Sequence, residues 1–162
     1  MPVLGKRTKP KHDIWITPPW VLRDLGTFDL DPCGAPDPAP WTTALKTIRL
    51  PSDGLTAPWE GRVFMNLPFS KIHPWIERMS LHGNGIALLP GRIETGWFHD
   101  FVWQKAHAVF IFRHRVNFCN MEGNVITGCD FPTILAAYGA QNAQTLGRAG
   151  LRVKMLPHVL LQ

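Results

Sequence analysis

The chain has few cysteines, and neither they nor its histidines form a metal-binding pattern. The three cysteines, Cys33, Cys119 and Cys129, are widely spaced, and no Cys-x-x-Cys pair occurs among the 162 residues. The seven histidines include no His-Glu-x-x-His motif. This spacing excludes the common zinc scaffolds and a disulfide framework, because both need closely patterned ligands or paired cysteines. We therefore expect reduced thiols in or near a core, and no metal site.

Long apolar runs are absent as well. No segment approaches the length of a membrane span, and the first residues lack the apolar core of a signal peptide. We expect a cytoplasmic protein with no membrane association. With 45% apolar and 18% charged residues, the composition is that of a folded chain. The length predicts a single domain over residues 13–162, preceded by a flexible basic arm at residues 1–12.

The charge balance is basic, with a net charge of +5 and a pI of about 9.5. Such a balance attracts polyanions, of which nucleic acids are the commonest. It permits a DNA or RNA partner without selecting one.

Apolar patterning predicts alternating strands and helices. Strands are expected at 28–31, 46–50, 62–65, 85–89, 107–112, 116–118 and 132–138, with a last one within 151–161. Helices are expected at 17–26, 74–82, 96–105 and 140–148, the first capped by Thr17 and stopped by Gly26. This order predicts an α/β fold with a mostly parallel mixed sheet and helices on both faces.

Three polar residues follow predicted strands. Asp31, Asp53 and Asn66 each come after an apolar run. Ligands of such sheets bind beyond the carboxyl ends of the strands. We therefore expect these side chains to meet at one rim.

The segment Asn66-Leu67-Pro68-Phe69 combines an amide, a stiff turn and an aromatic ring at the exit of a strand. The amide oxygen and a nearby backbone carbonyl can accept hydrogen bonds from an exocyclic amino group, and the ring can stack on a planar base. The segment is therefore suited to holding an amino-bearing base.

Six segments in the same order along the chain resemble the small phage-type DNA N6-adenine methyltransferases. They are Trp15-Ile16-Thr17-Pro18-Pro19, Phe28-Asp29-Leu30-Asp31-Pro32-Cys33, Asp53-Gly54-Leu55 with Trp59, Asn66-Leu67-Pro68-Phe69-Ser70, and the later stretches around residues 87–98 and 109–118. The resemblance spans roughly residues 13–138. It implies a Rossmann-like methyltransferase fold, S-adenosyl-L-methionine as cofactor and double-stranded DNA as partner, in a phage or bacterial host.

The resemblance also implies roles for individual residues. Seven would form the cofactor site: Trp15, Thr17, Pro18, Asp31, Pro32, Asp53 and Asn66. Four would hold and methylate a flipped adenine: Asn66, Leu67, Pro68 and Phe69. Four cations are candidate phosphate contacts: Lys71, Arg92, Arg113 and Arg115. Target sequence would be read by short loops such as 91–96 or 120–130, from a monomer or a homodimer.

Two departures from the family pattern keep alternatives open. Leu67 stands where the family has proline, which removes stiffness and places a bulky side chain by the base. The loop after Asp31 has one glycine, Gly34, in place of two or three. A methyltransferase for another amino group (cytosine N4, an RNA base or glutamine) and a non-catalytic nucleic-acid-binding relative are the competing interpretations.

Overall fold

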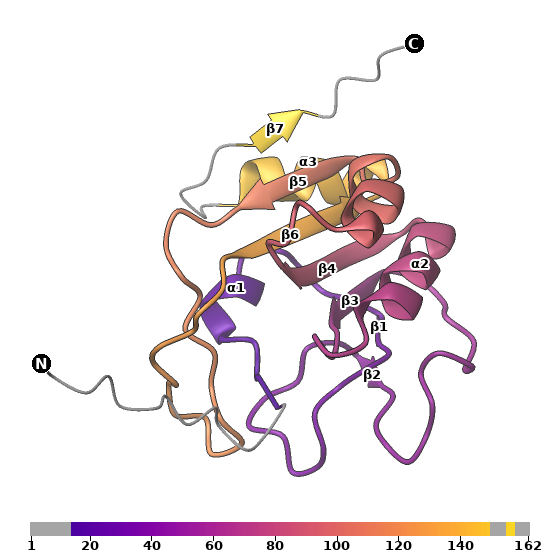
Figure 1. The fold of residues 1–162 in the computed structure, drawn as a ribbon. Coiled ribbons are helices and arrows are strands. Elements are labelled where there is room, and N and C mark those ends of the chain that lie inside the picture. The colour runs from indigo at the N-terminus through magenta and orange to yellow at the C-terminus, as the bar shows by residue number, and fades with distance from the viewer. Residues whose placement is uncertain (1–13, 150–154, 158–162) are drawn as a thin grey trace, which may run out of the picture.

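The structure, a computed structural model, describes residues 14–149 and the backbone of 155–157. One seven-stranded sheet organises it, in the order β2-β1-β3-β4-β6-β5-β7 (Figure 1). The strands are β1 (Leu30–Asp31), β2 (Lys46–Thr47), β3 (Val63–Asn66), β4 (Gly85–Pro90), β5 (Ala108–Ile111), β6 (Thr133–Tyr138) and β7 (Met155–Pro157). The predicted arm at 1–12 and most of 151–161 lie outside the described residues.

Strand directions make the sheet mixed but mostly parallel. Strands β2, β1, β3 and β4 pair in parallel, while β6 runs antiparallel between β4 and β5. Strand β5 therefore shares the direction of β1 to β4, and β7 pairs antiparallel with β5. The carboxyl ends of β1 to β5 thus lie along one edge, as the sequence predicted for the polar residues that follow them.

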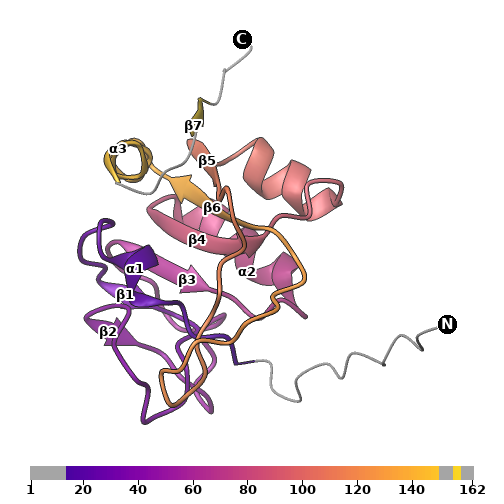
Figure 2. The same cartoon turned by 90° about the vertical axis from the view of Figure 1, so that its left-hand side faces the viewer.

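Helices cover both faces of this sheet, as Figure 2 shows edge-on. Helix α2 (Ile72–His82) and the π-helix η1 (Phe98–Trp103) lie on one side, and α1 (Pro19–Leu22) and α3 (Ala140–Arg148) on the other. Apolar residues at helical spacing, such as Trp75, Ile76 and Met79, turn α2 toward the sheet. None of the helices in the described ranges is long and apolar enough to cross a membrane.

Alternating side chains divide the core into two clusters. In β3, Val63 and Met65 pack on the α2 side, whereas Phe64 packs on the α3 side. All six residues of β4 are buried, as are all six of β6. Burial on both faces explains why these strands read as continuous apolar runs.

Two sequence predictions about this framework are wrong. Residues 116–118 form no strand: Val116 and Phe118 are buried in the core, but the next residue, Cys119, makes isolated bridges to Ile16 and Val125. Apolar residues here pack against the sheet without joining it. The first helix also spans only Pro19–Leu22, with Pro18 at the N-cap position instead of Thr17.

Candidate functional site

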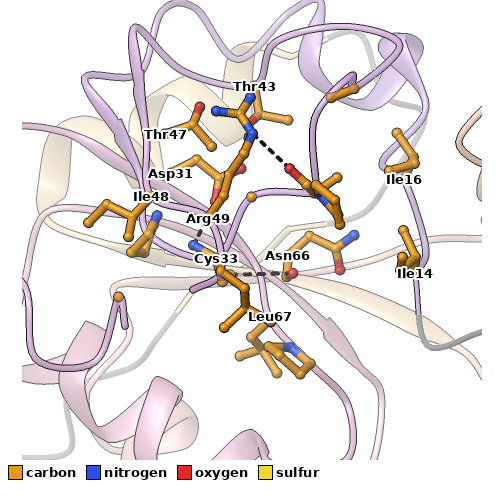
Figure 3. A pocket seen from close by; sticks show the side chains of 18 of the residues that line it. Ile14, Ile16, Asp31, Cys33, Thr43, Thr47, Ile48, Arg49, Asn66 and Leu67 are labelled. Carbon is orange, nitrogen blue, oxygen red and sulfur yellow. Dashed lines mark hydrogen bonds between the residues drawn. The ribbon is translucent and has the colours of Figure 1, made fainter. Parts of the chain in front are cut away.

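A cavity of about 370 Å³ opens at the carboxyl edge of β1, β2 and β3. Pockets for small ligands and cofactors have volumes in this range. Figure 3 shows how side chains from these three strand ends and from residues 14–17 converge on it. Of the residues predicted for cofactor and base, nine line the cavity: Trp15, Thr17, Asp31, Pro32, Asp53, Asn66, Leu67, Pro68 and Phe69. Pro18 is buried next to it and does not line it.

Asn66 ends β3 with its carboxamide held in one orientation. The side-chain nitrogen donates a hydrogen bond to the Trp15 carbonyl at 2.5 Å. The backbone carbonyl of Asn66 accepts a hydrogen bond from the Cys33 thiol at 3.5 Å. Among the described residues no group donates to Oδ1 of Asn66, so this oxygen is available to accept a hydrogen bond from a ligand.

The residues after Asn66 form a packed turn. Leu67 is only 2% exposed and belongs to the core cluster on the α2 side. Its side chain therefore packs into the core while the residue also lines the cavity. The Phe69 ring is fixed by edge contacts with Phe118 and Phe131, at 6.2 and 5.1 Å between centroids. Lys71 donates its backbone N–H to the Pro68 carbonyl at 3.0 Å, which closes the turn.

Asp31 is the most perturbed carboxyl group of the cavity. It is 3% exposed, and this burial raises its pKa from an ordinary 3.8 to about 6. The Thr43 hydroxyl and the Cys33 backbone N–H donate to the two carboxyl oxygens and oppose that rise in part, as does the nearby Arg49 charge. A buried carboxylate with few partners favours a ligand that brings a hydrogen-bond donor or a positive charge.

Thr17 has a side-chain hydroxyl that lacks a hydrogen-bond partner among the described residues. Its side chain is 2% exposed, and within the described part of the chain its hydroxyl makes no hydrogen bond. The sequence predicted this hydroxyl as a helix cap, but the helix begins two residues later and leaves it in the cavity wall. A buried hydroxyl without a partner is costly, so a ligand that pairs with it gains affinity.

Two glycines allow the cavity loops to interlock. A β-carbon on Gly54 would lie 1.8 Å from the Pro32 carbonyl oxygen, and one on Gly34 would lie 2.0 Å from Cγ2 of Thr47. Gly34 and Gly54 thus let the loops after β1 and β2 touch, although the sequence has no glycine-rich loop. Beside them, exposed Asp53 accepts the Leu55 backbone N–H at 2.9 Å, which sets its turn.

Three polar or aromatic lining residues with contacts of interest were not among the predicted site residues. They are Trp41, Thr43 and Arg49, all in segments read as loop or strand. The Trp41 indole donates to the Thr17 carbonyl at 2.9 Å and so joins the loop before β2 to the N-terminal segment. The sequence signal for this contact was a tryptophan in a proline-rich loop, because binding residues often lie on loops.

The predicted phosphate contacts lie outside the cavity. Lys71 follows β3, Arg92 follows β4, and Arg113 and Arg115 follow β5, and all four are exposed. Because these strands share one direction, the four residues leave the sheet at the edge that carries Asn66. Within residues 14–149 and 155–157, no three His, Cys, Asp or Glu side chains lie close enough to hold a metal ion.

One family of known proteins matches the sequence of this chain. The sequence model of the DNA N-6-adenine-methyltransferase (Dam) family matches residues 5–135. No curated protein and no solved structure matches the chain significantly. The family match covers more than half of the chain and includes every segment that forms the cavity. The chain therefore belongs to the DNA N-6-adenine-methyltransferase (Dam) family.

Proposed function

We propose that this protein transfers a methyl group from S-adenosyl-L-methionine to the N6 amino group of an adenine flipped out of double-stranded DNA. One observation carries the proposal. Asn66, whose Oδ1 has no donor among the described residues, lines the same cavity as the buried polar groups of Asp31 and Thr17. A donor and an acceptor of a methyl group can therefore be held side by side, and such positioning supplies much of the rate in transfer reactions.

The cavity suits the cofactor on three counts. The Thr17 hydroxyl lacks a partner among the described residues, and Asp31 can receive an ammonium or hydroxyl group. The close approach of Gly54 to Pro32 gives the smooth backbone wall that a nucleoside needs. Trp41 and Ile48 add apolar surface for an adenine ring. When bound, the cofactor supplies an electrophilic methyl group on a sulfonium.

Asn66 and Leu67 would hold the amino group that is methylated. Oδ1 of Asn66 and the Leu67 carbonyl have no described donor, so they can accept both N–H groups of the adenine amine. Two such hydrogen bonds favour a pyramidal nitrogen. The lone pair of that nitrogen is less delocalised into the ring and is therefore more nucleophilic. The amide of Asn66 is no strong base, so the proton leaves late and passes to water. Phe69 would stack on the flipped base.

The exposed cations at the same edge would hold the DNA. Neutralising one phosphate contact weakens binding and lowers the salt dependence of affinity by about one unit of slope. Arg113→Gln and Arg115→Gln are each expected to do so, and Arg148→Gln on α3 supplies an exposed control. If the salt dependence of DNA affinity in these two variants equals that of the unmodified protein, the two arginines do not contact the DNA.

The proposal is tested by transfer of tritiated methyl groups to unmethylated phage and bacterial DNA, followed by digestion to nucleosides. We expect label in N6-methyladenine. Asn66→Ala should slow transfer by about 100-fold or more, because it removes a hydrogen bond made to the reacting group. Gln144→Ala, which removes an exposed amide on α3, should not.

Other results would refute specific parts of the proposed function. Label in N4-methylcytosine, in RNA or in protein would refute the adenine substrate. If calorimetry detects no binding of S-adenosylmethionine, the proposed enzymatic activity is refuted. The remaining interpretation is then a non-catalytic DNA-binding relative.

A further inference from the structure

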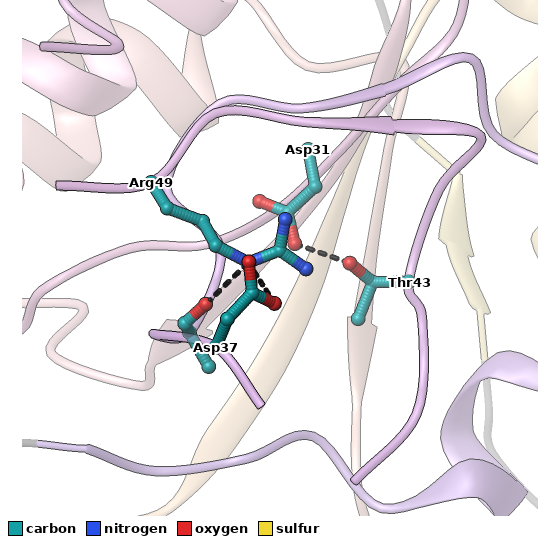
Figure 4. A network of polar contacts seen from close by, with 5 residues as sticks. Asp31, Asp37, Thr43 and Arg49 are labelled. Atoms are coloured by element: carbon teal, nitrogen blue, oxygen red, sulfur yellow. Dashed lines mark hydrogen bonds and ion pairs between the residues drawn. The ribbon is translucent and has the colours of Figure 1, made fainter. Parts of the chain in front are cut away.

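Arg49 supplies the positive charge of the cavity wall. Among the described lining residues it is the one cationic side chain, and it lies two residues beyond β2. Its side chain is 24% exposed, so it is partly shielded from water. Figures 3 and 4 both show its guanidinium beside Asp31 and Thr43.

The known contacts of Arg49 use one edge of the guanidinium. Nε donates to the Ala35 carbonyl at 2.8 Å and lies 3.2 Å from Oδ1 of Asp37. Neither Nη1 nor Nη2 forms a hydrogen bond with a described residue. Four N–H donors are thus left on a side chain that is suited to binding carboxylates through two parallel hydrogen bonds.

Asp37 shows that this position accepts a carboxylate. The Asp37 side chain is 73% exposed, and an ion pair of that exposure contributes little stability. Because Asp37 contacts Nε and leaves Nη1 and Nη2, a ligand carboxylate can bind there, opposed only by the charge of Asp37. Because Asp31 lies next to Arg49, the wall offers one negative and one positive group, which together complement an α-amino acid zwitterion.

We infer that Arg49 binds the α-carboxylate of S-adenosyl-L-methionine, with Asp31 facing the α-ammonium group, an inference that rests on the proposed function. Asp37 then competes with the cofactor for the same guanidinium. Arg49 is thereby a cofactor-binding residue that selects ligands carrying an intact amino-acid end.

A purely structural role is the competing explanation for Arg49. Its bond to Ala35 ties the loop after β1 to the end of β2, so its loss could loosen the whole cavity. The two roles differ in one respect. A loosened wall weakens every adenosine ligand, whereas a missing carboxylate contact weakens only those ligands that carry the carboxylate.

Calorimetry with S-adenosylmethionine and with 5′-methylthioadenosine, which lacks the amino-acid end, separates these roles. Arg49→Gln should weaken S-adenosylmethionine binding by about tenfold or more, the size of one charged hydrogen bond, and leave methylthioadenosine affinity unchanged. Asp37→Asn should strengthen S-adenosylmethionine binding, because the competing carboxylate is gone. Arg23→Gln, which removes an exposed arginine outside the cavity, should change neither affinity.

Each contrary outcome has a distinct meaning. Equal weakening of both ligands by Arg49→Gln, or no weakening of either, refutes the carboxylate contact and leaves the proposed function standing. Weaker binding of S-adenosylmethionine to Asp37→Asn also refutes it, since this variant keeps Arg49. Failure of the unmodified protein to bind S-adenosylmethionine refutes both the inference and the proposed function.

Discussion

Replacing Asp31 by asparagine should stabilise the free protein at neutral and alkaline pH. Burial raises the pKa of this carboxyl from 3.8 to about 6, so the folded state holds its proton more tightly than the unfolded chain. The contribution of Asp31 to stability is therefore most favourable below pH 4 and is lost as the pH rises through about 6. A pKa difference of this size corresponds to about 3 kcal/mol of unfolding free energy once the pH is above 6.

The expected change in the unfolding free energy of Asp31→Asn follows from the same contacts. Asparagine has no charge to bury, but it offers one oxygen where the carboxylate accepts from both Thr43 and Cys33. Losing one of these hydrogen bonds costs about 1 kcal/mol at every pH. The expected net gain for Asp31→Asn is therefore about 2 kcal/mol at pH 8. About half of the pH-dependent part, roughly 1.5 kcal/mol, appears between pH 5 and pH 8.

Urea unfolding followed by tryptophan fluorescence at pH 5 and pH 8 measures this difference. Exposed Glu94→Gln is the control for the removal of one carboxylate. A stability difference between Asp31→Asn and the unmodified protein that stays constant from pH 5 to pH 8 would refute the reasoning. In calorimetry the same variant should bind S-adenosylmethionine more weakly, because the proposed partner of the ammonium group is lost. A gain in stability with a loss of binding is the expected signature of a buried functional carboxylate.

Three further substitutions test other parts of the cavity. Thr17→Val should leave thermal stability equal or higher, because it removes a buried hydroxyl that has no partner among the described residues. In calorimetry it should weaken S-adenosylmethionine binding. Gly54→Ala should lower the melting temperature and abolish cofactor binding, because its β-carbon would lie 1.8 Å from the Pro32 carbonyl oxygen. The control Gly96→Ala, where a β-carbon meets open space, should bind the cofactor normally. Leu67→Pro should speed methyl transfer, because proline stiffens the turn. It should also lower stability by about 2 kcal/mol, because the core packing of Leu67 is lost. No gain in transfer rate would show that the missing proline does not limit activity.

Local sequence patterns predicted most of the framework. Helix α3 at Ala140–Arg148 has the predicted bounds, and β3, β4 and β6 lie within a residue of them, since continuous burial leaves a strong apolar signal. Strands β1 and β2 are shorter than predicted, at two residues each. The predicted strand at 116–118 failed because burial alone does not provide a neighbouring strand edge with free hydrogen-bonding groups.

The features of the cavity were likewise predicted in part from the sequence and decided in part by the tertiary structure. By itself the sequence determined which chemical groups are present and that Asp31, Asp53 and Asn66 emerge at one edge, because residues after parallel strands must meet there. Only the tertiary structure decided the state of each group. A hydrogen bond to the Trp15 carbonyl orients Asn66, and Thr17 has no hydrogen-bond partner among the described residues. The fold also buries Asp31 and brings Arg49 beside it. These contacts join residues distant in the chain, and burial, orientation and pKa depend on distances that no local pattern contains.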